Sequence, residues 1–137
     1  MPNERVAQYM RRGAITCSEE TSLHFVAQIM VVNRIRYCAV VNEIHEVMGL
    51  ISADNMISAF GKDFDQMTAK AILSRDTIVT VTLNTPIEEA VTLMAKKGIE
   101  HLIVVSERVN SRAVIGMVYA SDIIAKMARR QEQEALS

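Results

Sequence analysis

Few side chains in this sequence have the types and spacing that catalysis or metal binding requires. The histidines His24, His45 and His101 show neither an i, i+4 pair nor an HExxH motif. Asp63 and Asp65 lack the further ligands and the glycine of a calcium-binding loop. The glycine-rich loops that cradle phosphates are absent as well. We therefore expect a protein that is not an enzyme and that requires no metal or other cofactor.

The two cysteines, Cys17 and Cys38, each lie inside an apolar segment and lack the CxxC spacing of a zinc or redox site. A free cysteine packs as a small hydrophobic residue. We expect both thiols to be reduced and to point into packed apolar surroundings, not at each other in an exposed pair.

The composition restricts the partners that the chain can have. The 137 residues carry 15 Lys and Arg against 16 Asp and Glu, and half of the residues are apolar. This length and composition favour one compact unit with a real core. A net charge of −1 gives no broad attraction for nucleic acid or for an anionic membrane. A short basic cluster, Lys126, Arg129 and Arg130, leaves nucleic acid as a minor alternative partner. No apolar run approaches the ~20 residues of a membrane span, and Met1 to Arg12 is too charged for a secretory signal. A cytoplasmic location is expected.

An internal repeat determines which elements must position any site. A shift of 64 places Thr21 to Val41, TSLHFVAQIMVVNRIRYCAVV, over Thr85 to Val105, TPIEEAVTLMAKKGIEHLIVV. The same shift carries Arg11 onto Arg75. After three extra residues the shift becomes 67, and GLISA at 49–53 aligns with GMVYA at 116–120. The chain therefore contains two copies of one structural unit.

Each copy shows the periods of a β-α-β-β-α unit. Leu23, Val26, Ala27 and Met30, and in the second copy Ile87, Ala90, Val91 and Met94, follow the spacing of an amphipathic helix. Thr21 and Thr85 lie where an N-cap belongs, Pro86 lies at a first helical position, and Gly98 marks a helix end. Short β-branched runs predict strands over 15–17, 37–41 and 47–51, and over 79–81, 101–105 and 113–118. The last helix of each copy is predicted from Ala53, Met56, Ile57 and Phe60, and from Ile123, Ile124, Met127 and Ala128.

The expected organisation follows from these elements. The first repeat covers residues 6–60, a polar linker 61–66, the second repeat 67–128, and a helical tail 129–137. One copy of roughly 60 residues is marginally stable alone, so we expect the two to pack face to face around a pseudo-twofold axis. The fold class is α+β.

These residues resemble the cystathionine-β-synthase (CBS) domain, whose tandem pairs are called Bateman modules. The similarity covers about residues 6–128, and the second copy, TVTLNTPIEEAVTLMAKKGIEHLIVV followed by GMVYASDI, is close to the family pattern. The resemblance implies that AMP, ADP, ATP or S-adenosylmethionine binds in clefts between the copies. It assigns to one cleft Ile15, Ile35, Arg36 and Tyr37 with Tyr119, Ser121 and Asp122. To the other it assigns Ser74, Val79, Ile99, Glu100 and His101 with Ser52 and Asn55.

The chemistry of the implied residues agrees with such ligands. A carboxylate such as Asp122 can accept hydrogen bonds from both hydroxyls of a ribose, and its place in the first turn of a helix favours an anion. Arg36 and His101 would face phosphates. The alternatives are that Asp122 only supports the helix N-terminus and that Arg36 is an ordinary solvated residue. Tyr119 stands where the family has a smaller hydroxyl side chain, and Asn55 replaces the acid in the first copy.

The residues and the family resemblance are compatible with two functions. The first is a regulatory, nucleotide-binding module that senses an adenosine ligand and signals to a separate effector protein. The second is a structural dimerisation or interaction module whose clefts are vestigial. In either case the helices expose more apolar surface than a two-copy core can cover, so we expect a homodimer.

Overall fold

The computed structural model describes residues 4–13, 15–108 and 111–136 and, for 130–136, only the course of the helix. The chain divides into two compact units, where its length had suggested one. Unit 1 comprises residues 1–13, 79–107 and 115–137, and unit 2 comprises residues 14–78 and 108–114. The expected β-α-β-β-α order is present twice, so the predicted α+β fold is confirmed.

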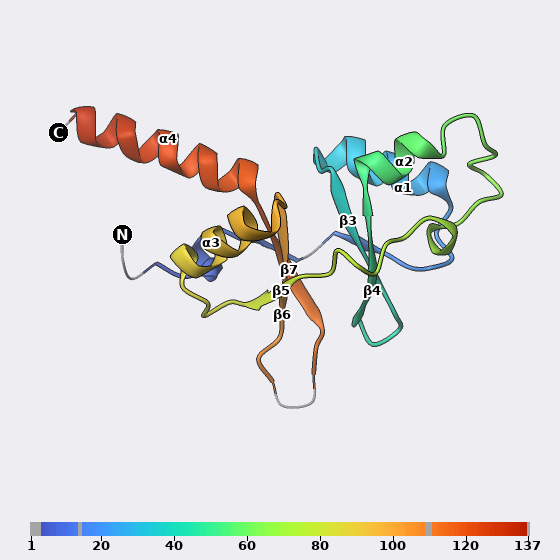
Figure 1. Cartoon of the computed structure of the whole chain (residues 1–137), viewed down its shortest axis with the longest axis horizontal. Coiled ribbons are helices and arrows are strands. Elements are labelled where there is room, and N and C mark those ends of the chain that lie inside the picture. The colour runs from blue at the N-terminus through green and yellow to red at the C-terminus, as the bar shows by residue number, and fades with distance from the viewer. Residues whose placement is uncertain (1–3, 14, 109–110, 137) are drawn as a thin grey trace. The chain divides into compact units, whose positions relative to one another are not determined.

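Unit 2 holds a three-stranded sheet in the order β2-β3-β4, with two helices beside it (Figure 1). Its elements are β2 (Thr16–Cys17), α1 (Leu23–Asn33), β3 (Tyr37–Val41), β4 (Val47–Ser52), α2 (Ala53–Ser58) and the 3-10 turn η2 (Ala69–Ala71). β2 is parallel to β3, and β4 is antiparallel to it. The predicted strands are reproduced to within one residue at each end.

Unit 1 holds a four-stranded sheet in the order β1-β7-β6-β5. Its elements are the 3-10 turn η1 (Val6–Gln8), β1 (Arg11–Arg12), β5 (Thr80–Thr82), α3 (Ile87–Lys97), β6 (His101–Val105), β7 (Val114–Tyr119) and α4 (Ala120–Leu136). The core is built mainly from one face of α3 and the central strands, and its buried members include Val81, Ile87, Ala90, Met94, Leu102, Val104, Val118 and Ile123.

The first residues of each repeat pack with the other repeat. Val6 is fully buried in the core of unit 1, and its backbone N–H donates to the carbonyl of Thr85 at 2.8 Å. In unit 2, Ala69 is fully buried and donates in the same way to Thr21, also at 2.8 Å. Each compact unit is therefore completed by residues distant in the sequence, which places Arg11 beside the second repeat.

The helix starts differ from the sequence prediction by one residue. Ser22, not Thr21, caps α1, because its side chain accepts from the N–H of Phe25. The Thr21 hydroxyl instead accepts from the N–H of Ser18, and Thr85 accepts from Thr82 in the same way. Each of these threonines therefore closes the turn that precedes its helix. Residue type alone does not distinguish this role from that of an N-cap.

The helices α1 and α3 end in the same left-handed conformation, with Arg34 at φ 53° and Gly98 at φ 65°. This region costs a residue with a Cβ about 1–2 kcal/mol, offset by about 0.4–1 kcal/mol from the lower entropy of its unfolded chain. Gly98→Ala should therefore lower the free energy of unfolding by about 0.5–1 kcal/mol, whereas Arg34→Gly should raise it by a similar amount. Urea unfolding of both variants measures this, and effects of the same sign would contradict it.

Several apolar residues predicted to face the core are exposed. In α1 and α3 the buried residues are Leu23, Val26, Met30, Ile87, Ala90 and Met94, as expected, but Val91 is exposed. At the second helix of each repeat the prediction is wrong for most positions, and the exposed residues are Ile57, Phe60, Ile124, Met127 and Ala128. The period of a helix identifies its apolar stripe but not how much of it a small sheet can cover.

No helix in the described part of the chain is long and apolar enough to cross a membrane.

Candidate functional site

The first turn of α4 in unit 1 carries the clearest arrangement of polar groups. The N–H of Ala120 donates to the carbonyl of Glu100 at 2.9 Å, which fixes the start of the helix beside the start of β6. Ser121 and Asp122 follow at once, with Ser121 exposed and the Asp122 side chain 29% exposed. Negative charge is favoured at this position by the helix dipole. The backbone of Glu100 thus lies next to the turn that carries Ser121 and Asp122, although the resemblance assigns Glu100 to the other cleft.

A residue that the sequence analysis did not assign to the site holds the Asp122 carboxylate. Arg11 donates from Nε to Oδ2 at 2.8 Å and from Nη2 to Oδ1 at 3.1 Å, which is a bidentate fork. The Asp122 hydrogen bond, followed by its charge, raises the pKa of Arg11 above its ordinary value, against the opposing effect of burial. The repeat had aligned Arg11 with Arg75, but pairing across 111 positions leaves no periodic signal.

Tyr119 lies beneath the same arginine. The guanidinium carbon of Arg11 lies 5.0 Å from the centroid of the Tyr119 ring, a distance at which cation and ring attract each other. The tyrosine is 6% exposed. Its bulk therefore supports Arg11 from below and does not project into solvent over the start of α4.

The corresponding place in unit 2 is built differently. The Ala53 N–H donates to the carbonyl of Arg36 at 2.7 Å, and Tyr37 pairs with Ser52 across β3 and β4. The Asn55 side-chain oxygen, however, accepts from both the N–H and the hydroxyl of Ser52, at 2.9 and 3.0 Å. The amide oxygen that would accept from a ligand is thus occupied by the cap of α2.

Arg75, the counterpart of Arg11, has different partners in unit 2. It donates to the carbonyl of Met48 at 2.8 Å and lies 3.6 Å from a carboxylate oxygen of Glu19. Among the described residues, the start of α2 in unit 2 therefore has neither the acid nor the arginine fork that the start of α4 has in unit 1. The starts of α2 and α4 occupy equivalent positions in the repeat, but they present different chemical groups.

Most of the remaining predicted residues come just before a strand of their own unit. Arg36 is exposed, Ile35 is buried, and Ile15, Val79 and Ile99 are half-buried. Ser74 exchanges two backbone hydrogen bonds with Leu50 in unit 2. His101 is only 3% exposed, so contact with a phosphate would require its neighbours to move. The structure groups these residues by unit, and their pairing across the repeats stays a prediction.

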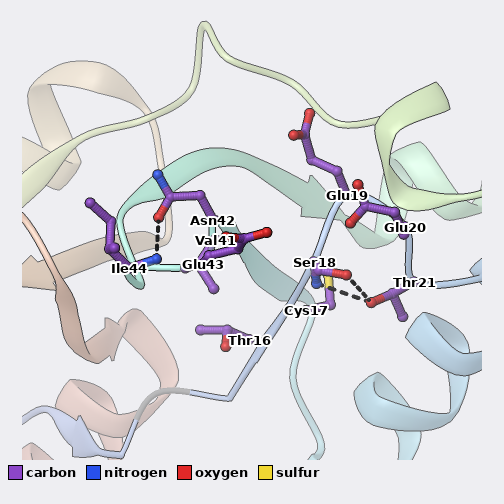
Figure 2. Close-up of a pocket in the computed structure, with 10 residues that line it drawn as sticks. All are labelled: Thr16, Cys17, Ser18, Glu19, Glu20, Thr21, Val41, Asn42, Glu43 and Ile44. Atoms are coloured by element: carbon purple, nitrogen blue, oxygen red, sulfur yellow. Dashed lines mark hydrogen bonds between the residues drawn. The ribbon is translucent and has the colours of Figure 1, made fainter.

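A pocket of about 740 Å³ lies in unit 2 at the carboxyl ends of β2 and β3. Residues 16–21 and 41–44 line it, and Figure 2 shows Glu19, Glu20 and Glu43 among them. None of the predicted site residues lines this pocket, because Arg36 and Tyr37 lie at the opposite end of β3. Its three carboxylates oppose a phosphate by like charge. The pocket therefore does not suit an adenine nucleotide.

The cysteines are both free and buried, as expected. The two thiols lie close together, however, because a hydrogen bond that the Cys38 thiol donates to Cys17, together with burial, raises the pKa of Cys38 above its ordinary value. Cys17 pairs with Val40 in parallel strands, which puts Cys38 two residues away on the same face. Burial on this face keeps Cys38 in its protonated, unreactive form.

The family model "CBS domain" matches the chain twice, at residues 6–62 and 69–129. The uncharacterized protein MK0525 of Methanopyrus kandleri is 31% identical over 127 residues, which cover 90% of this chain and 63% of that protein. A homoserine O-acetyltransferase of Methanosalsum zhilinae is 30% identical over 125 residues, 91% of this chain. The chain spans less than two thirds of MK0525 and only 24% of that acetyltransferase.

Among solved structures, the CBS domain pair of protein MJ0100, crystallised with 5′-methylthioadenosine and S-adenosyl-L-methionine, has the same fold. Its TM-score is 0.81 at 22% identity, over 94% of this chain and 99% of that chain. With the family model matched twice over nearly the whole length, these findings show that the chain belongs to the CBS domain family, as a tandem pair of CBS domains.

Proposed function

We propose that this CBS pair is a regulatory module that binds an adenosine-type ligand, with the ribose on Asp122 at the start of α4. AMP, ADP, ATP and S-adenosylmethionine are the candidate ligands. The observation that carries the proposal is the bidentate fork from Arg11 to an Asp122 carboxylate that remains 29% exposed. The complex of the MJ0100 pair with 5′-methylthioadenosine and S-adenosyl-L-methionine supports the choice of ligand class.

The Arg11 fork leaves the carboxylate able to accept a ligand. An ionised carboxylate has about four lone-pair sites, of which the two N–H groups of Arg11 use two. The remaining two match the adjacent hydroxyls of a ribose. Arg11 therefore orients the carboxylate, as a positioning residue, and reduces the freedom that binding would otherwise have to remove.

Unit 2 offers a weaker site for the same ligand. Asn55 has an amide oxygen already engaged by Ser52 and a donor group that ribose hydroxyls do not need. We therefore propose that the acid-bearing repeat is the occupied one. The predicted contribution of Ile15, Ile35, Arg36 and Tyr37 to that ligand remains part of the proposal.

The module would act on another protein. A ligand shifts an equilibrium only by its different affinity for two states, so signalling requires an effector whose binding depends on the occupied form. We propose a homodimer in the cytoplasm as the working form. The second candidate function, a structural interaction module, is favoured by the apolar side chains that α1 and α2 expose.

A thermal-shift panel of AMP, ADP, ATP, S-adenosylmethionine and cyclic dinucleotides, with guanosine nucleotides as controls, separates the two functions. A ligand at about 100 times its Kd should stabilise the fold by about 2.7 kcal/mol, which is several degrees in melting temperature for a chain of this size. We expect one or more adenosine ligands to give this shift while guanosine nucleotides do not. A folded protein that none of the ligands stabilises would be a structural module.

A further inference from the structure

The two buried cysteines of unit 2 form a pair that the proposed ligand site does not use. Cys17 in β2 lies opposite Val40 in the parallel strand β3, so Cys38 lies on the same face, two residues away along β3. The Cys38 Sγ lies 3.8 Å from the carbonyl oxygen of Ile15, so its side chain leans toward the segment that enters β2. The Cys38 thiol also donates a hydrogen bond to Cys17. The two sulfur atoms therefore lie within reach of each other.

The two thiols differ in their access to small molecules. Cys17 lines the pocket of about 740 Å³ at the carboxyl ends of β2 and β3, and Figure 2 shows it among the lining residues. Cys38 is fully buried and is not among the residues that line this pocket. A small molecule that enters the pocket therefore meets Cys17 first.

The hydrogen bond between the thiols makes Cys17 the more nucleophilic of the two. Because Cys38 donates this bond, the bond lowers the pKa of Cys17 below its ordinary value, against the opposing effect of burial. The negative charge then lies on the sulfur nearer to solvent, where a charge is better tolerated. A thiolate, not a thiol, is the nucleophile in cysteine chemistry. Cys17 is therefore suited to attack an electrophile, while Cys38 keeps its proton.

The charges around the pocket indicate which oxidants can reach Cys17. Glu19, Glu20 and Glu43 line the pocket, and Arg75 lies 3.6 Å from the Glu19 carboxylate. Glu20 and Glu43 are exposed, and their carboxylates repel an anionic oxidant such as glutathione disulfide. Hydrogen peroxide is small and uncharged, so these carboxylates do not oppose its entry. The pocket therefore favours a neutral hydroperoxide.

We propose that Cys17 and Cys38 form a peroxide-sensitive dithiol, in which Cys17 reacts with a hydroperoxide and Cys38 then closes an intramolecular disulfide. In the first step the Cys17 thiolate attacks one peroxide oxygen, an S–O bond forms and the O–O bond breaks. The departing hydroxide takes up the proton that Cys17 released when it ionised. In the second step the Cys38 sulfur attacks the Cys17 sulfenic acid, the S–O bond breaks, and the hydroxyl leaves with the Cys38 proton as water. The two thiols lose two electrons in total, and the peroxide is reduced to water.

The position of β2 makes this disulfide reversible. With neighbouring strands about 4.8 Å apart and a rise of about 3.3 Å per residue, the diagonal between the Cα atoms of Cys17 and Cys38 is about 8 Å. Disulfides usually join Cα atoms about 4.4–6.8 Å apart. β2 is a two-residue strand at the edge of its sheet, so it can move toward Cys38 by the difference. A bridge closed by such a movement is strained, and a strained disulfide is more readily reduced.

Peroxide treatment of the full chain tests the dithiol directly. Once reductant is removed, hydrogen peroxide should convert the folded wild type from two free thiols per chain to none, counted after unfolding. The intact mass should fall by two hydrogen atoms, and a peptide map should link Cys17 to Cys38. The protein should run at the mass of one chain on a denaturing, non-reducing gel, and dithiothreitol should restore both thiols. Two thiols retained by the folded wild type, at a peroxide concentration that oxidises a free cysteine peptide, would overturn the proposal, as would a disulfide between two chains.

Serine variants of the two cysteines separate their roles. In Cys38→Ser, oxidation of Cys17 should stop at the sulfenic acid, which dimedone traps as one adduct per chain. In Cys17→Ser, Cys38 should keep its thiol and give no adduct, because it is buried away from the pocket. Circular dichroism checks that both variants are folded. Labelling of Cys38 in Cys17→Ser as fast as that of Cys17 in Cys38→Ser would contradict the assignment.

Two alkylating reagents test the charge of the pocket. In the Cys38→Ser protein, neutral iodoacetamide should modify Cys17 faster than anionic iodoacetate, by a ratio several-fold larger when folded than when unfolded. Glu43→Gln in the same background should reduce this ratio, whereas Glu89→Gln, at an exposed acid of α3 in unit 1, should not. Equal ratios in the folded and unfolded chain would overturn the choice of a neutral oxidant. Because no adenosine ligand is added, a failure of the dithiol and a failure of the ligand site remain distinguishable.

Discussion

Gly116→Ala is expected to lower the free energy of unfolding by about 1–3 kcal/mol, the usual cost of overpacking. A Cβ at this position would lie 2.6 Å from the backbone carbonyl oxygen of Arg11, which β1 holds against β7. Backbone within a paired strand cannot move aside without breaking its register. Urea unfolding, followed by circular dichroism, measures the loss.

Gly49→Ala is the matched control, because Gly49 aligns with Gly116 in the repeat. A Cβ there would meet Leu73 instead, with the closest atom the terminal Cδ1 of a flexible side chain, also at 2.6 Å. A rotamer change can relieve part of that contact, so Gly49→Ala should cost less than Gly116→Ala. If Gly49→Ala lowers the free energy of unfolding as much as Gly116→Ala does, or more, the backbone of β1 is not what excludes a side chain at position 116.

Asp122→Asn is expected to weaken binding of the adenosine ligand by about 10- to 100-fold. The substitution keeps the size of the side chain but removes a charged acceptor, whose hydrogen bonds contribute about 1.5–3 kcal/mol. The ligand-free stability should change little, because the Arg11–Asp122 pair is partly exposed. Asp54→Asn is the control, since Asp54 is an exposed acid in the first turn of α2. An unchanged Kd in Asp122→Asn would remove Asp122 from the site.

The variant Arg11→Met tests whether Arg11 orients the Asp122 carboxylate for the ligand or competes with the ligand for it. If Arg11 orients the Asp122 carboxylate, its loss should weaken ligand binding, since the carboxylate then has to be ordered by the ligand itself. If Arg11 instead competed with the ribose for the carboxylate oxygens, its loss would tighten binding. A lower Kd in Arg11→Met, measured by titration calorimetry, would therefore contradict the positioning role.

The order of the elements was predictable because local periods encode it. The strands 37–41 and 101–105 were predicted to the residue, and Gly98 ends its helix as expected. The exposure of Ile57 and Phe60 was not predictable, because a helical period does not say how far the neighbouring sheet extends. Each unit is also completed by the first residues of the other repeat, and such long-range docking has no periodic signal.

The candidate site was predicted only in part for the same reason. Residue type and position identified Asp122 at the start of a helix, and the structure places it there. The arginine that holds it came from 111 positions away, and the occupied oxygen of Asn55 depends on rotamer choice within a cap. Sequence indicates which groups are available, whereas their hydrogen-bond partners depend on tertiary packing.

The most direct test of the central claim is a calorimetric titration of the adenosine ligand that gives the largest thermal shift into the wild-type protein. The account predicts saturable binding at one site per chain, at the acid-bearing repeat, with binding weakened about 10- to 100-fold in Asp122→Asn and unchanged in Asp54→Asn. Absence of saturable binding to folded wild type, or equal affinity in wild type and Asp122→Asn, would contradict it.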